Sequence, residues 1–167
     1  MTVKPTNHEI KFTKDTILVT KTDLKGIITY ANRAFVKIVG LEEAELIGQP
    51  HNIIRHPDMP KIIFKYLWEY LQNGLEIHAY VKNLCKDGSF YWVMANVTPS
   101  IDYSINKPIG YHSARRLPTA EALAIIEPLY KQLLQAEKVG GMQASEKILK
   151  NLLQEKGMQY DEFILSF

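Results

Sequence analysis

The alternation of hydrophobic and polar positions predicts strands in the first two thirds of the chain. Five short runs are rich in β-branched and aromatic residues and are bounded by turn residues, a pattern typical of antiparallel strands. These runs are residues 16–20, 26–31, 76–84, 89–98 and 108–115. Asp87-Gly88 supplies the positive φ angles of a tight hairpin turn, and residues 99–107 are expected to form a polar loop.

The residues between the second and third of these runs have the spacing of apolar positions that is typical of helices. Asn32 can cap a short helix that Gly40 ends, and residues 42–46 predict one further helical turn. A longer helix is expected from Pro60 to Gly74, because proline suits a first turn and glycine suits a helix end. Its apolar residues fall on one face: Phe64, Leu67, Trp68 and Leu71.

Beyond the fifth run the pattern becomes helical. Residues 119–138 carry one apolar stripe, and Pro128 within it should kink the helix or restart it. Gly140-Gly141 breaks the pattern, residues 143–156 resume it, and the tail YDEFILSF adds a last apolar turn. The order of elements predicts an α+β fold, with a five-stranded antiparallel sheet, short helices on one face and a C-terminal helical hairpin.

Composition indicates a soluble globular protein with one domain and an appendage. The chain has 167 residues, of which 46% are hydrophobic and 23% charged, and its formal net charge is +2. This charge is too small to indicate a nucleic-acid partner, and no apolar stretch approaches the ~20 residues needed to cross a bilayer. The N-terminus lacks an apolar core of signal-peptide length, and a sole cysteine, Cys85, rules out an intramolecular disulfide. We therefore expect a cytoplasmic protein that reaches a membrane through a partner.

The segment HNIIRHPDMP, residues 51–60, concentrates charge-capable groups on a stiffened backbone. Arg55 and His56 can donate charge-assisted hydrogen bonds to a phosphate or an electron-rich ring, and Asp58 can orient one of them. The prolines limit the conformational freedom that binding would remove. Taken alone, these residues favour a simpler interpretation, a surface turn with an Arg–Asp pair worth under ~1 kcal/mol.

Three stretches resemble PAS domains, and two of them resemble the aerotaxis-receptor type. LIGQPHNIIRHPDMP resembles the helical segment that lines the ligand cleft in that type, and TAEALAIIEPLYKQL resembles the segment that follows its PAS domain. KDGSFYWVMANVTP resembles a hairpin shared by many PAS domains. The resemblance covers roughly residues 15–135. It implies a PAS fold whose cavity binds FAD noncovalently, with FMN or haem as alternatives.

The resemblance implies a redox sensor and not an enzyme. The chain is similar to the stand-alone PAS half of bipartite energy-taxis systems, in which a separate membrane-bound chemotaxis transducer carries the signal. The implied partners are that transducer and a second copy in a homodimer, without nucleic acid or direct membrane insertion. The expected parts are residues 1–14 as a cap, 15–118 as the PAS sensor domain and 119–167 as a helical output or assembly segment. A simple C-terminal cap is the alternative for the last part.

Eight residues are candidates for contact with the cofactor. They are Asn32, Arg55, His56, Asp58, Phe64, Trp68, Asn83 and Trp92. Some have a simpler interpretation: Asn32 as a helix cap, Asn83 as an exposed polar residue and Trp68 as a core residue. Since side chains alternate along a strand, either Trp92 or its neighbours Tyr91 and Val93 face the cavity. Ile77 stands where related receptors often carry a tryptophan.

Other chemistries remain as alternatives. A haem-binding gas sensor would use His51, His56, His78 or His112 as the iron ligand, and a ligand-free interaction module would use none. Light-sensing LOV domains carry their reactive cysteine in an Asn-Cys-Arg-Phe-Leu-Gln helix, whereas Cys85 lies in NLCKDG beside a hairpin turn. Photoadduct chemistry is therefore not expected. The sequence has no Gly-x-Ser-x-Gly, paired-cysteine, His-Glu-x-x-His or P-loop motif, so we expect neither hydrolysis nor a metal site.

Overall fold

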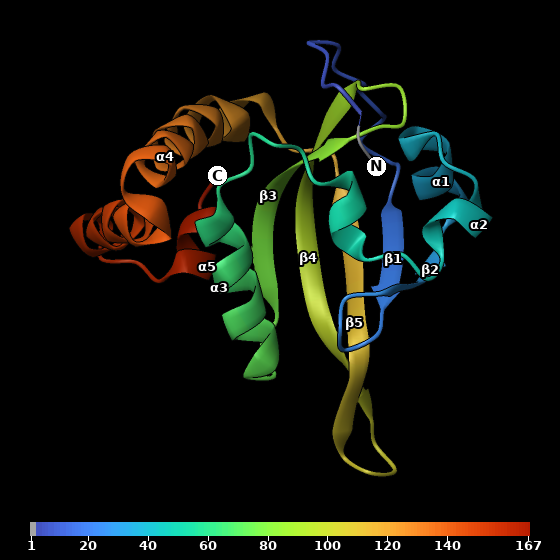
Figure 1. Cartoon of the computed structure of the whole chain (residues 1–167). Helices are drawn as coiled ribbons and strands as arrows, with labels where there is room; N and C mark the ends of the chain where they lie inside the picture. The colour runs from blue at the N-terminus through green and yellow to red at the C-terminus, as the bar shows by residue number, and fades with distance from the viewer. Residues whose placement is uncertain (1–2) are drawn as a thin grey trace.

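The computed structural model describes residues 3–167, and there a five-stranded antiparallel sheet forms the centre of the molecule (Figure 1). Its strands are β1 (Leu18–Thr22), β2 (Ile28–Ala31), β3 (Ile77–Leu84), β4 (Phe90–Asp102) and β5 (Lys107–Arg116). They lie in the order β2-β1-β5-β4-β3, so β2 forms one edge and β3 the other. The fold class expected from the sequence is confirmed.

Four helical elements connect β2 to β3. They are α1 (Arg33–Val39), α2 (Glu43–Leu46), the 3-10 helix η1 (His51–Ile54) and α3 (Lys61–Gln72). The predicted ends of α1 are confirmed: the Asn32 side chain accepts a hydrogen bond from the Phe35 N–H, and Gly40 ends the helix with φ 74°. Helix α3 begins after Pro60, which offers no side-chain hydrogen bond to the first turn.

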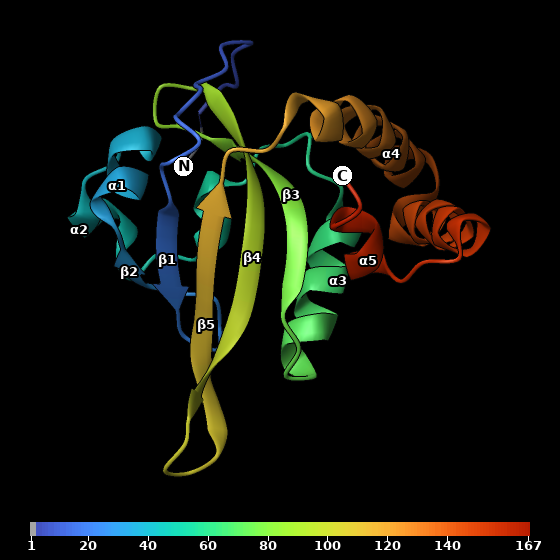
Figure 2. The ribbon, with the colours of Figure 1, turned by 180° about the vertical axis from the view of Figure 1, so that it is seen from behind.

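The C-terminal helices are α4 (Ala120–Lys156) and α5 (Tyr160–Ile164). Gly141 interrupts α4 with φ 72° and ψ −175°, so the predicted break at Gly140-Gly141 is confirmed, whereas the helix continues through Pro128. Figures 1 and 2 both show α4 and α5 beyond β3, where they lie beside α3. Within residues 3–167, no helix combines the length and the apolar character that a membrane span requires.

Side-chain alternation gives the sheet two different faces. Odd-numbered residues of β3 and β4, such as Val81 and Ala95, face the side of η1 and α3. Even-numbered residues face the other side, where the Trp92 ring centroid lies 6.0 Å from that of Tyr130 in α4. The Tyr130 hydroxyl donates a 2.7 Å hydrogen bond to the Tyr80 carbonyl oxygen. Different helices therefore contact the two faces of the sheet, and on the outer face the contact with α4 is at Trp92 and Tyr80.

The predicted loop at residues 99–107 is wrong in its extent. Strand β4 continues to Asp102 and pairs with β5 from Lys107, and the two form a ribbon that projects beyond the sheet (Figure 1). Strand β3 begins with Ile77, opposite Val97, so the part of β4 beyond Val97 has β5 as its neighbour and a free edge on the other side. Proline is tolerated on a strand with a free edge, which explains how Pro99 remains part of β4.

Candidate functional site

A cavity lies between the inner face of the sheet and the segment that runs from η1 into α3. Its volume is about 180 Å³. Its apolar and aromatic walls include Phe64, Leu67, Trp68, Leu71, Val81, Val97 and Tyr111. Its polar lining includes Thr20, His51, Arg55, Asn83, Ser113 and Arg115. Apolar walls with a few convergent polar groups are typical of small-molecule sites.

The segment 51–60 is held against the edge strand β3. Arg55 and Asn83 form an isolated antiparallel bridge, and the His56 N–H donates a 3.3 Å hydrogen bond to the Lys82 carbonyl oxygen. In return, the Lys82 N–H lies 3.2 Å from the Met59 sulfur. The segment, for which a surface turn was the simpler interpretation, instead makes an additional pairing on the sheet, and this pairing places Arg55 beside Asn83 at the cavity.

Arg55 is fixed at the cavity by an aromatic contact. Its guanidinium carbon lies 3.5 Å from the centroid of the Phe64 ring, a cation–π arrangement. Partial burial lowers the pKa of Arg55 from its ordinary value, because the charged form loses solvation. Two of the predicted residues, Arg55 and Phe64, are thus brought together, and Arg55 lies next to Asn83, a third.

A second buried cation, Arg115, was not among the predicted residues. Its Nη2 lies 2.8 Å from the Thr20 hydroxyl and 2.7 Å from His51 Nε2, and its side chain is 5% exposed. Burial lowers the pKa of Arg115 to about 10, so the guanidinium stays charged at neutral pH. Burial, reinforced by the charge of Arg115, lowers the pKa of His51 to about 3. His51 is therefore neutral, and its Nε2 accepts the hydrogen bond.

Several polar atoms at the cavity have no partner within residues 3–167. They are Arg55 Nε, Asn83 Nδ2, Ser113 Oγ and Arg115 Nη1, all of them buried. Three of the four are obligate donors. Leaving a buried donor unsatisfied costs about 1–3 kcal/mol, and more when it is charged. Their convergence on one cavity indicates a ligand that presents hydrogen-bond acceptors.

Trp68 closes one side of the cavity. Its ring centroid lies 5.6 Å from that of Tyr111 in an edge-on arrangement. The far edge of its indole reaches Gly26, where an added Cβ would lie 3.3 Å from two ring carbons. Gly26 has φ +80°, so this position requires glycine both for its backbone and for the close approach of the ring. Trp68 lines the cavity, as the sequence predicted.

Four of the eight candidates lie outside the cavity lining, and these predictions are corrected. The amide of Asn32 is fully used: its oxygen accepts from the Val19 and Phe35 N–H groups, and its nitrogen donates to the Ile17 carbonyl. Trp92 is on the opposite face of the sheet, against α4, because β4 turns its odd-numbered residues toward the cavity.

His56 and Asp58 are also displaced from the cavity. The His56 ring is buried edge-on to Phe90, with centroids 5.8 Å apart, and its Nδ1 accepts from the Asp58 N–H. The Asp58 carboxylate is exposed and pairs with Lys82 at 2.7 Å. Both residues thus brace the segment 51–60 on β3 and do not line the cavity.

Lowering the pH is expected to destabilise the folded protein through its buried histidines. Burial lowers the pKa of His51 to about 3 and that of His56 to about 4, below their ordinary value of 6.5. The unfolded chain therefore binds more protons below pH 6.5, and stability decreases as the pH falls from 6.5 toward these values. The urea midpoint of the wild type should fall between about pH 7.5 and pH 5. His51→Gln should reduce this fall, and the exposed-site variant His8→Gln should keep it; an unchanged fall in His51→Gln would contradict the assignment.

The other reactive groups named from the sequence lie elsewhere. His78 Nδ1 pairs with Asp161 of α5 at 3.0 Å, and His112 alternates with the cavity residues of β5 and so faces away. Cys85 is buried at the end of β3, where its sulfur lies 3.2 Å from the Ile38 carbonyl oxygen. Burial raises the pKa of the Cys85 thiol to about 11. This cysteine lies outside the cavity lining. Because its pKa is raised, it stays in the thiol form at neutral pH, which is the unreactive form.

Comparison with known proteins identifies the fold family. Residues 28–115 match a family described as PAS fold. The chain is 41% identical over 152 residues to the aerotaxis receptor of Escherichia coli (strain K12), a match that covers 91% of this chain and 28% of the receptor. It is 28% identical over 86 residues to the nitrogen fixation regulatory protein of Klebsiella pneumoniae, covering 52% of this chain and 17% of that protein.

Solved structures agree on the architecture. The PAS domain of a protein from Colwellia psychrerythraea superposes with a TM-score of 0.55 at 23% identity, covering 62% of this chain and 86% of that chain. At this identity the likeness concerns the fold alone. The curated relatives are much longer than the matched region, since the chain spans 28% and 17% of their lengths.

Proposed function

Because this chain belongs to the PAS family and is of the aerotaxis-receptor type, we propose that its cavity binds a flavin nucleotide, FAD, and that the protein is a redox sensor. The observation that carries the proposal is the convergence of unpartnered donors from Arg55, Asn83 and Arg115 on one cavity with apolar walls. Within the described residues these donors have no acceptor of their own, which is the arrangement expected of a site that is completed by its ligand.

The residues present fit the chemistry of a flavin. The isoalloxazine ring is flat and apolar on its faces, and one edge carries carbonyl oxygens and ring nitrogens that accept hydrogen bonds. Trp68, Phe64 and Tyr111 would pack against the ring, with ~0.5–1.5 kcal/mol per aromatic pair beyond the buried area. The donors of Arg115 and Asn83 would satisfy the accepting edge. Exposed Lys25 on the lining offers a cation to a phosphate.

A bound flavin supplies reversible uptake of electrons and protons, with a change in the charge of its ring. Arg115 keeps its charge across the physiological range, and burial beside this cation disfavours protonation of His51 by lowering its pKa. The protein side of the site is therefore electrostatically fixed, so a change in ligand charge changes the strength of its hydrogen bonds. Such differential interaction is what a redox-dependent shift between two conformations requires.

The downstream partner belongs to the same proposal. The relative from Escherichia coli is named an aerotaxis receptor, and the chain aligns with 28% of it. We propose that the protein is cytoplasmic and that it signals by contact with a membrane-bound chemotaxis transducer. Coupling of this kind typically changes partner affinity by 1–3 kcal/mol.

A haem gas sensor is the second candidate, and the geometry disfavours it. His51 is the histidine that lines the cavity among the described residues. Its Nε2 faces the Arg115 guanidinium at 2.7 Å and the Thr20 hydroxyl at 3.1 Å. An iron ion at that nitrogen would have to displace both groups and approach a buried cation.

The visible absorption spectrum of freshly purified protein tests the proposed function. We expect a yellow protein with an absorption band at about 450 nm that bleaches with dithionite, as oxidised flavins do. A Soret band at about 410 nm would identify haem instead. A colourless protein that takes up no added FAD would contradict the proposal and favour a ligand-free interaction module.

A further inference from the structure

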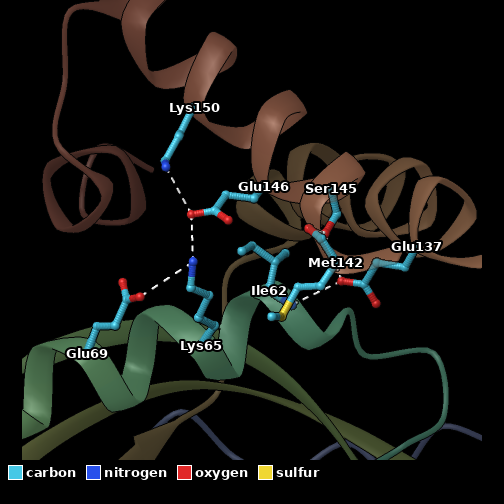
Figure 3. A network of polar contacts seen from close by, with 8 residues as sticks. All are labelled: Ile62, Lys65, Glu69, Glu137, Met142, Ser145, Glu146 and Lys150. Atoms are coloured by element: carbon cyan, nitrogen blue, oxygen red, sulfur yellow. Dashed lines mark hydrogen bonds and ion pairs between the residues drawn. The ribbon is translucent and has the colours of Figure 1, made fainter. Parts of the chain in front are cut away.

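The first turn of α3 is capped by a side chain from α4. The backbone N–H groups of Lys61 and Ile62 donate hydrogen bonds of 2.9 and 3.0 Å to the two carboxylate oxygens of Glu137. Figure 3 shows Ile62 and Glu137 at this contact. Pro60, at the N-cap position, has no side chain that could accept them. A carboxylate at a helix N-terminus also interacts favourably with the helix dipole. The start of α3 thus depends on a residue 75 positions away in the sequence.

Glu137 also connects the two halves of α4. Gly141 breaks the helix four residues later, and Ser145 lies in the first turn of the second half. The Ser145 hydroxyl is fully buried and lies 2.9 Å both from Glu137 Oε1 and from the Met142 carbonyl oxygen. One carboxylate therefore holds together the start of α3, the end of the first half of α4 and the beginning of its second half.

A second contact between the same elements is weaker. Lys65 of α3 lies 2.7 Å from Glu146, which also pairs with Lys150 at 2.9 Å (Figure 3). The side chains of both lysines are partly or largely exposed. Solvated ion pairs of this kind contribute ~0–1 kcal/mol. The Lys65–Glu146 ion pair therefore serves as a comparison for the contact at Glu137, which is partly exposed and joins a carboxylate to two backbone N–H groups.

The capped turn lies directly beside the cavity. Phe64, two residues after Ile62, carries the Arg55 guanidinium at 3.5 Å from its ring and lines the cavity. Trp68 lines it one turn further along the same helix. Because a helix is stiff over one turn, a displacement of Arg55 and Phe64 must move the N–H groups that Glu137 accepts.

We propose that Glu137 is the residue that couples the cavity to the C-terminal helical hairpin. A change in the hydrogen bonding of the cavity shifts the first turn of α3, and the Glu137 cap passes this shift to the break at Gly141 and to the helix that follows. The route runs around the β3 edge through α3, and not through the outer face of the sheet where Trp92 and Tyr130 meet. The inference rests on the proposed function for the nature of the signal, but the mechanical link rests on the contacts at Glu137 alone.

Hydrogen exchange of backbone amides tests this link. Exchange of residues 138–150 is measured in the intact protein with FAD oxidised and after reduction by dithionite. In the wild type we expect the two states to differ by about fivefold or more, the lower range of typical coupling. In Glu137→Gln we expect less than about half of that difference on a logarithmic scale, with an unchanged flavin spectrum. Glu146→Gln, which alters the ion pair with Lys65 between the same two helices, should behave as the wild type.

A second arm does not require a flavin. Phe64→Leu alters the cavity wall directly, and its effect on exchange near Gly141 should be clear in the wild-type background and absent in the Glu137→Gln background. Equal effects in the two backgrounds would overturn the coupling role, as would a flavin-loaded wild type whose residues 138–150 exchange identically in both redox states. A protein that binds no flavin would overturn the proposed function instead, and the Phe64→Leu comparison would still decide the role of Glu137.

Discussion

Replacing Arg115 with methionine is expected to weaken FAD binding by at least about tenfold without lowering the stability of the ligand-free protein. Hydrogen bonds to charged groups contribute about 1.5–3 kcal/mol, which corresponds to roughly 10-fold to 150-fold in affinity. In the ligand-free protein, however, Arg115 is 5% exposed, and within residues 3–167 its Nη1 has no partner. Methionine has a similar length and removes this desolvation penalty, and His51 retains Thr20 as a hydrogen-bond partner.

The opposite signs of these two effects make the experiment specific. Affinity is measured by titrating the apoprotein with FAD, and stability by urea unfolding of the same sample. Arg116→Met is the matched control, because Arg116 is exposed and alternates to the other face of β5. If Arg115→Met bound FAD as the wild type does, or if its apoprotein lost stability in parallel with its affinity, Arg115 would be a structural residue and not a ligand contact.

Substitution of Trp92 by alanine is expected to cost about 3–5 kcal/mol of unfolding free energy, the usual range for a buried tryptophan. Its side chain is 6% exposed and packs against Tyr130 of α4, on the side of the sheet away from the cavity. The fraction of Trp92→Ala that remains folded should therefore bind FAD with nearly wild-type affinity. Urea unfolding measures the loss, and titration below the unfolding transition measures the affinity.

Trp68→Ala is the matched comparison and should show the reverse pattern. Its ring is partly exposed and lies over the cavity between Tyr111 and Gly26, so its removal should lower FAD affinity more than stability. Two tryptophans of the same size would thus separate the ligand face from the packing face. A Trp92→Ala protein that is folded but no longer binds FAD would contradict the assignment of the flavin site to the face of the sheet opposite Trp92.

The contrast between the tryptophans also shows where sequence reasoning ends. Alternation correctly implied that Trp92 and its neighbour Tyr91 face opposite sides of the sheet. It could not say which side holds the cavity, because both residues are buried. The choice is made by long-range packing: α3 lies over the cavity face, and α4 packs against Trp92 on the other. Helix ends, by contrast, were predictable because Asn32 and Gly40 act within one turn of the helix they limit.

The two arginines of the site, Arg55 and Arg115, also differ in whether the sequence could predict them. Arg55 stood out because it lies among prolines in a short segment, and the structure places it at the cavity. Arg115 shares its segment with exposed Arg116, and alternation alone identifies one of them as inward without saying which. His51 was considered as an iron ligand, but its role as a neutral acceptor depends on Arg115, 64 residues away. Contacts of that separation leave no local pattern.

Glu137 illustrates the same limit for the C-terminal segment. Its position in the sequence predicts one more solvated charge on a helix, and the sequence predicts residues 119–167 to be either a helical output or assembly segment or a simple cap. The contact joins Glu137 to backbone groups of α3 that lie 76 and 75 positions away in the sequence. The sequence predicts the break at Gly140-Gly141, but helical periodicity does not predict which element the helix before this break packs against.

A crystal structure of the protein purified with its colour tests the central claim most directly. The account predicts a flavin ring in the cavity between the sheet and α3, with its accepting edge within hydrogen-bonding distance of Arg115 Nη1 and Asn83 Nδ2, and with Trp68 packed against it. Electron density for the ring outside this cavity would contradict the account. A cavity filled by the protein's own side chains, with Arg55 and Arg115 paired to protein groups in place of a ligand, would also contradict it.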